Sequence, residues 1–156
     1  MPKIDIAAIP EDNSCGYPAP FNEIARGRFR RRLGNAGGLT EFGVNLCRLE
    51  PGSASSQRHW HEREEEMVYM LEGEVVLVDE SGEAVLRPGD AATFKPGIAD
   101  GHHLVNRSDR DALLLEIGTR PATDVVRYAD VDMVLRYDEA TDVFCRRSGE
   151  PYDETT

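Results

Sequence analysis

Turn signals recur along most of this chain and constrain its fold more than any other feature. Between Leu39 and Gly118, clusters such as Pro51-Gly52, Glu80 to Gly82 and Arg87 to Asp90 interrupt short apolar or alternating runs about every ten residues. Helices need longer periodic segments, whereas strands of a sandwich or barrel need no more than this. The pattern therefore predicts an all-β domain with antiparallel hairpins.

The residue composition and the turn pattern change at both ends of this region, which predicts that the chain has three parts. Residues 1–38 are rich in proline, glycine and arginine and are expected to form an extended N-terminal arm, because proline disfavours helices and central strands. Residues 39–120 form the predicted β domain. Residues 121–156 are expected to be a C-terminal extension packed on it, with residues 125–138 forming either a short helix or a strand pair.

Composition limits the classes of partner and the compartment. The 156 residues are expected to fold as one domain, and a net charge of −11 argues against nucleic acid and anionic membranes. No apolar run has membrane-spanning length, and the start lacks the pattern of a signal peptide. Three widely spaced cysteines argue against a disulfide framework, so a reduced, cytoplasmic protein is expected.

A basic run interrupts the acidic chain in the N-terminal arm. We interpret it as a solvated face or as partners for the surplus of carboxylates, with a docking patch for phosphate or carboxylate as the alternative. The run comprises Arg26, Arg28, Arg30, Arg31 and Arg32.

The four histidines of the chain fall in two short clusters, His59/His61 and His102/His103. Side chains alternate along a strand, so His59 and His61 point the same way and can share an ion. The same rule places Glu66 on one face of the next strand. Its companions on that face are Val68 and Met70, whereas Met67, Tyr69 and Leu71 face the other way.

The spacing of these residues resembles the first motif of the cupin superfamily, G-x5-H-x-H-x(3,4)-E-x6-G. One extra residue precedes the first histidine, and every other spacing fits. The matching residues are Gly52, His59, His61, Glu66 and Gly73. The resemblance implies a jelly-roll barrel, the double-stranded β-helix, with a metal held inside it by His59, His61, Glu66 and a histidine of the second motif.

The second motif, G-x5-P-x-G-x2-H-x3-N, is matched more loosely. Lys95 stands where the motif has proline, and four residues separate the glycine from the histidine. The matching residues are Gly89, Gly97, His102 and Asn106. His102 is the predicted fourth ligand because of its distance to Asn106, and His103 is the alternative, because a shift of one residue reverses every side chain.

The resemblance and the ligand types together predict one divalent transition metal. Three imidazoles and a carboxylate suit Zn, Fe, Mn, Ni or Cu, and two coordination positions would stay open for substrate or water. We expect a metal-dependent isomerase, lyase or dioxygenase acting on a small oxygenated molecule such as a sugar derivative. The run from Gly101 to Ala112 resembles small bacterial cupins, some of them labelled as sugar-phosphate isomerases.

Other functions stay open at this point. A non-catalytic small-ligand-binding or sensor cupin is the first alternative, and a structural protein without metal is the second. The general acid or base is not fixed, and the candidates are Lys95, Asp100, Tyr69 and the spare histidine. A homodimer is expected from the resemblance.

Overall fold

The structure is a computed structural model that describes residues 3–138 and 140–152. Strands dominate it, and every strand pairing is antiparallel, which confirms the all-β prediction. The elements are η1 (Ile6–Ala8), η2 (Phe21–Ala25), β1 (Arg28–Arg32), α1 (Leu33–Ala36), β2 (Phe42–Leu49), β3 (His59–His61), β4 (Glu66–Glu72), β5 (Val75–Asp79), β6 (Gly82–Leu86), β7 (Ala91–Phe94), β8 (His103–Val105), β9 (Ala112–Thr119), β10 (Asp124–Tyr128), β11 (Val134–Tyr137) and β12 (Asp142–Cys145).

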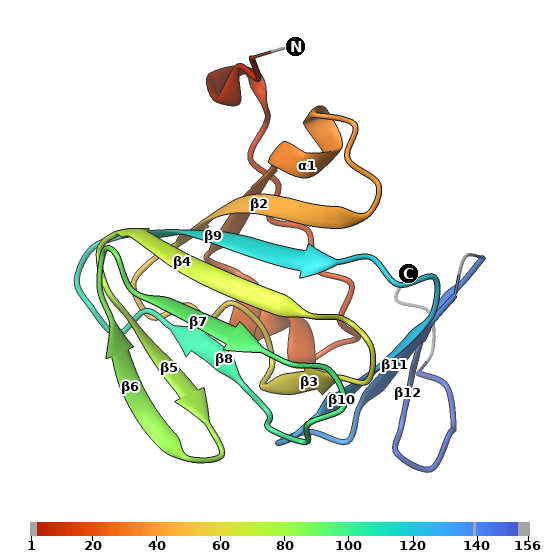
Figure 1. The fold of residues 1–156 in the computed structure, drawn as a ribbon. Helices are drawn as coiled ribbons and strands as arrows, with labels where there is room; N and C mark the ends of the chain where they lie inside the picture. Colours follow the sequence, from red (N-terminus) through yellow and green to blue (C-terminus); the bar gives the residue numbers. More distant parts are fainter. Residues whose placement is uncertain (1–2, 139, 153–156) are drawn as a thin grey trace.

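The strands form three sheets, with orders β1-β2-β9-β4-β7, β12-β11-β10-β3 and β6-β5-β8. In Figure 1 the five-stranded sheet runs across the upper part of the molecule, and the two smaller sheets lie below it. Strands far apart in sequence are neighbours in space: β9 lies between β2 and β4, and β10 pairs with β3. An isolated antiparallel bridge between His59 and His102 joins the two histidine clusters.

The predicted alternation along β4 is confirmed. Val68 and Met70 are buried in the core, whereas Met67, Tyr69 and Leu71 on the opposite face are 36%, 37% and 36% exposed. The main core lies between the five-stranded sheet and the β6-β5-β8 sheet. Its buried members are Cys47, Leu49, Val68, Met70, Val75, Leu77, Leu86, Leu104, Ala112 and Leu114.

Turn chemistry explains the position of one motif glycine. Gly73 joins β4 to β5 with a φ of 71°, a conformation that side chains disfavour. A Cβ at this position would also lie 2.7 Å from the carbonyl oxygen of Asp111. The predicted hairpin that follows is confirmed as β5 paired with β6.

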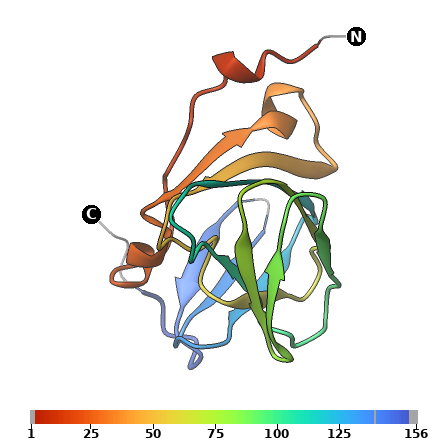
Figure 2. The same cartoon turned by 90° about the vertical axis from the view of Figure 1, so that its left-hand side faces the viewer.

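Both chain ends contribute strands to these sheets. Residues 28–32 of the predicted arm form β1, which pairs with β2 along its whole length. Residues 124–128 of the predicted extension form β10 beside β3, and the segment after it forms strands, which settles the choice between helix and strand pair. Figure 2 shows the segment from residue 3 to residue 27 running along the outside of the sheets before β1 begins. The three-part division of the chain stays a prediction.

The helices of the described residues are all short. None of them is long and apolar enough to cross a membrane.

Candidate metal centre

Strand β3 is only three residues long, and its two edges fix where its histidines lie. One edge pairs with β10, where His59 lies opposite Tyr128 and His61 opposite Val126. The main chain of His59 also exchanges two hydrogen bonds with His102, at 3.1 and 2.9 Å. The second histidine cluster is therefore joined to the first through the backbone. Trp60 alternates to the other side, where the guanidinium of Arg127 lies 5.8 Å from its ring centroid.

Three imidazoles converge on one carboxylate oxygen. Oε2 of Glu66 lies 3.1 Å from Nε2 of His102, 3.5 Å from Nε2 of His61 and 3.8 Å from Nε2 of His59. Ligand atoms of His59, His61 and Glu66 all lie within 4.8 Å of one another. The structure thus brings together the four residues that the sequence analysis selected.

The other ring nitrogen of each histidine has an acceptor. With an ion bound, such a contact would hold the N–H at Nδ1 and turn the Nε2 lone pair toward the ion, in place of the hydrogen bond that Nε2 of His102 makes to Glu66. The acceptors are Gln57 O at 2.9 Å for His59, Asp124 Oδ2 at 2.6 Å for His61 and Asp100 O at 3.1 Å for His102. The donor set therefore fits a transition metal that takes nitrogen and oxygen ligands.

The structure separates the two adjacent histidines. His102 is buried, and its ring stacks on Phe94 with centroids 3.5 Å apart and an angle of 2°. His103 points elsewhere: its Nδ1 lies 3.0 Å from the carbonyl oxygen of Ser56. Burial lowers the pKa of His103, so this imidazole is neutral at neutral pH. His102 therefore lies beside His59, His61 and Glu66, whereas His103 lines the cavity next to them.

Burial and charge set the protonation of the cluster. Burial lowers the pKa of His59 to about 4, which keeps the imidazole available as a ligand at neutral pH. Burial alone would raise the pKa of Glu66, but the hydrogen bond from His102 and the neighbouring His59 and His61 lower it to about 2. The centre thus presents an ionised carboxylate among imidazoles.

Asp124 supports His61 from behind. Its side chain is fully buried. Its carboxylate accepts main-chain N–H bonds from Arg63 at 2.8 Å, Val125 at 2.8 Å and Glu64 at 3.4 Å, in addition to the His61 ring. Because these donors occupy both oxygens, Asp124 orients the imidazole and is not free to bind an ion itself.

Glu64 is a second carboxylate near the centre, 3.5 Å from Nδ1 of His61. Burial, followed by the charges of Glu66 and Asp124, raises its pKa to about 8. Gly118 makes room for it, since a Cβ on that residue would overlap Glu64 Oε1. The sequence analysis did not select Glu64 as a site residue. The glycine at position 118 is the one signal for the space that this side chain fills.

The four candidates for proton transfer lie in different places. Tyr69 is on the outer face of the sheet. Lys95 and Asp100 line a cavity of about 220 Å³ that also contacts His61, Glu66 and His102. His103, the spare histidine, lines a larger cavity of about 730 Å³, which His59, His61 and Glu66 also line.

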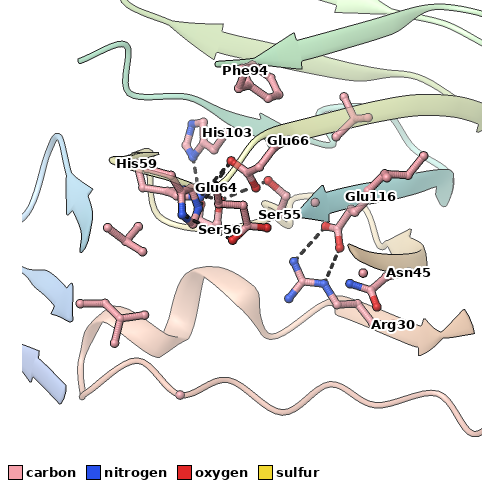
Figure 3. A pocket seen from close by; sticks show the side chains of 18 of the residues that line it. Arg30, Asn45, Ser55, Ser56, His59, Glu64, Glu66, Phe94, His103 and Glu116 are labelled. Carbon is pink, nitrogen blue, oxygen red and sulfur yellow. Dashed lines mark hydrogen bonds and ion pairs between the residues drawn. The ribbon is translucent and has the colours of Figure 1, made fainter. Parts of the chain in front are cut away.

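The larger cavity extends from the centre to a charged group that the sequence analysis missed (Figure 3). Arg30 of β1 forms a two-point ion pair with Glu116 of β9, and both line the cavity. The arginine run was interpreted mainly as a solvated face or as partners for carboxylates, and Arg30 is such a partner. The available signal was Glu116 itself, a lone charge in the apolar run from Ala112 to Ile117.

Comparisons with known proteins identify the family of the chain. A family model described as a cupin domain matches residues 45–118. A β-D-galactosidase from Mycobacterium tuberculosis is 33% identical over 110 residues, covering 70% of this chain and 90% of the relative. The crystal structure of a sugar phosphate isomerase of the cupin superfamily from Silicibacter pomeroyi is 45% identical. It covers 97% of this chain and 96% of its own, with a TM-score of 0.94.

A more distant structure, the polyketide cyclase RemF from Streptomyces resistomycificus, shares the fold at 19% identity. Its TM-score is 0.66, with 84% of this chain and 87% of that chain covered. The jelly-roll prediction is thereby confirmed. The family model and the similar bacterial proteins together establish that this chain belongs to the cupin superfamily, as a small cupin domain.

Proposed function

We propose that this protein is a metal-dependent enzyme that acts on a sugar or a similarly oxygenated small molecule. One divalent transition metal, Zn, Fe, Mn, Ni or Cu, would be held by His59, His61, Glu66 and His102. The observation that carries the proposal is the convergence of three Nε2 atoms on Oε2 of Glu66 at the end of a large cavity.

A bound ion of this kind would supply Lewis-acid chemistry, polarising a carbonyl or lowering the pKa of a hydroxyl. The residues around it would orient the reacting group. Phe94 and His102 stack into a flat wall, and Glu64 lines the cavity next to Glu66. Because its raised pKa keeps Glu64 protonated at neutral pH, it would donate a proton to the substrate and then take one back, which makes it a stronger candidate than the four groups chosen from sequence.

The relatives narrow the reaction class within this proposal. One is named for a sugar phosphate isomerase and another for a β-D-galactosidase, so both names refer to carbohydrate chemistry. Isomerisation or elimination on a sugar needs a Lewis acid and a proton carrier. A dioxygenase would in addition need a redox metal. We therefore favour an isomerase or lyase over a dioxygenase.

The test combines elemental analysis with activity. Protein purified without an affinity tag should contain about one transition-metal ion per chain, and the loaded protein should turn over members of a panel of aldoses, ketoses and their phosphates. Glu66→Gln should lose both properties. The matched control is Glu65→Gln, because Glu65 is the exposed neighbour. Full metal loading without turnover of any panel member would favour a ligand-binding or sensor cupin, and loss of both properties in the control would contradict the proposal.

A homodimer and a cytoplasmic setting complete the proposal. The outer face of β4 carries Met67, Tyr69 and Leu71, an apolar strip suited to a second copy of the chain. Light scattering that gives a monomer mass would remove the dimer. The three cysteines are free among the described residues, which supports a reducing compartment.

A further inference from the structure

The end of the large cavity away from the histidines is built from three polar side chains on the inner face of the five-stranded sheet. Glu116 on β9 lies opposite Asn45 on β2, and Arg30 comes from the neighbouring β1. Figure 3 shows these side chains grouped together on one side of Glu66. All three line the same cavity as His59, His61 and Glu66.

The ion pair keeps part of its hydrogen-bonding capacity for the cavity. Nε and Nη2 of Arg30 donate to the two carboxylate oxygens of Glu116 at 2.6 and 2.9 Å. The side chains remain 23% and 16% exposed. Nη1 of Arg30 has no acceptor within the described residues, and each carboxylate oxygen keeps a lone pair. The pair therefore offers both a donor and acceptors to whatever enters.

Asn45 adds an amide without a partner. Its side chain makes no hydrogen bond to any residue in 3–138 or 140–152, although it is partly buried and lines the cavity. An amide carries two donors and an acceptor, which hydroxyl groups satisfy well. Donors and acceptors in alternation match a chain of hydroxyls, since each hydroxyl both donates and accepts.

We propose that Arg30, Glu116 and Asn45 form a hydroxyl-binding wall that holds the part of the substrate away from the metal and selects an uncharged polyol over a phosphorylated one. This inference rests on the proposed function and adds to it the substrate class and the residues that choose it. The wall binds substrate and takes no part in the bond changes at the metal.

Charge balance disfavours a phosphate at this wall. The charge of Arg30 is matched by Glu116, and Arg32, which also lines the cavity, pairs with Asp12 at 2.9 Å. Recognition of a phosphate needs guanidinium groups that are free to turn toward it. Neither of these arginines is free to do so.

The two remaining arginines of the cavity have no carboxylate partner among the described residues, but they do not converge. Arg28 lies opposite Leu49 in the sheet, and Arg120 lies beside Gly43. Leu49 and Gly43 are six residues apart on β2, a separation of about 20 Å in an extended strand. Main-chain oxygens of Ser55 and Leu39 already engage their guanidinium groups.

The Arg30–Glu116 pair could also serve only to fasten β1 to the sheet, and the experiment separates these roles. In the double variant Arg30→Met/Glu116→Leu, apolar side chains of similar volume replace both charges, a change that often leaves stability unaltered. The matched control replaces an ion pair outside the cavity that joins the N-terminal segment to β2, Glu11→Leu/Arg48→Met. Asn45→Ala is a second test that keeps the ion pair.

Binding is measured by calorimetry on metal-loaded protein with D-galactose, D-glucose and D-mannose and with their 6-phosphates. The wild type and the matched control should bind at least one free sugar more tightly than its phosphate. The inner double variant should lose about tenfold or more in sugar affinity, since several hydrogen bonds disappear, and Asn45→Ala about threefold or more. Melting temperature and metal content should stay those of the wild type.

Unchanged sugar affinity in Asn45→Ala and in a folded double variant would overturn the wall, as would tighter binding of the phosphates. Sugar binding that depends on the wall in a protein that takes up no metal would overturn the proposed function alone. A metal-loaded wild type that binds no free sugar would overturn both.

Discussion

Glu66 and Glu116 lie on the inner face of the same sheet, on adjacent strands, yet their surroundings give them different roles. Glu66 lies opposite Gly118 on β9, and Glu116 lies opposite Val68 on β4. Burial alone would raise the pKa of both, and in both the neighbours lower it again: chiefly the hydrogen bond from His102 for Glu66, and Arg30 for Glu116.

The two kinds of neighbour differ in one respect that matters. Imidazole can release its proton and bind a cation, whereas guanidinium stays protonated in proteins. The carboxylate among histidines therefore suits a metal ion. The carboxylate beside arginine stays in a neutral pair that suits hydroxyl groups. The nature of the neighbouring base, more than burial, distinguishes the two ends of the cavity.

The largest expected effect comes from removing one member of the neutral pair. Glu116→Leu leaves the guanidinium of Arg30 without its partner in a partly buried site, and should lower the free energy of unfolding by about 3 kcal/mol. Urea unfolding at neutral pH measures the loss. Adding Arg30→Met should restore most of the stability. A Glu116→Leu variant as stable as the wild type would show that Glu116 does not neutralise Arg30 as the comparison with Glu66 requires.

Removing one imidazole should affect metal affinity more than stability. His102→Ala deletes a ligand and should weaken metal binding by more than about 100-fold, since even the groups that orient ligands contribute 10- to 100-fold. His103→Ala should leave the affinity near that of the wild type, because His103 turns toward Ser56. Competition with a chromogenic chelator measures both affinities. The reverse order would assign the fourth ligand to His103.

Asp124→Asn tests the support behind the metal centre. The amide can still face Nδ1 of His61. The substitution removes the negative charge that makes the imidazole a stronger electron-pair donor to a metal. Metal affinity should fall by about 10- to 100-fold. The same chelator competition applies, with the melting temperature of the metal-free protein as the control for folding. An affinity equal to that of the wild type would mean that this carboxylate serves the fold alone.

The smallest effect concerns the ion pair between Glu11 and Arg48 outside the cavity. Its contribution to stability can be compared with that of the Arg30–Glu116 pair inside the cavity. The hydrogen bond from Arg48 lowers the pKa of Glu11, so this contact stabilises the fold above the usual carboxylate range and loses its contribution as the pH falls through the lowered pKa. Glu11→Gln should cost about 0.2 to 1 kcal/mol at pH 7, and progressively less as the pH falls below the usual carboxylate range. Thermal unfolding over a series of pH values measures this change. A cost that does not depend on pH would contradict the electrostatic explanation.

Local geometry explains which parts of the centre could be predicted. Alternation along a strand fixes the relation of His59 to His61 and of Glu66 to Val68, whatever the rest of the fold does. The contacts that arrive from distant strands were missed, namely Asp124 behind His61 and Glu116 as the specific partner of Arg30. Their positions follow from pairings between β3 and β10 and between β1 and β2, which no local pattern encodes. The choice between His102 and His103 depended on register in the same way.

The residues that line the large cavity extend beyond the segment that the family model matches. That segment covers residues 45–118, whereas Ser14, Cys15, Gly16 and Tyr17 also line the cavity. A shortened protein that begins at residue 39 would keep all four proposed ligands and lose one side of the chamber in front of them. Exchanging this N-terminal segment with that of a relative would therefore reshape one side of the cavity while leaving every proposed ligand in place, a direct route to changing what the cavity holds.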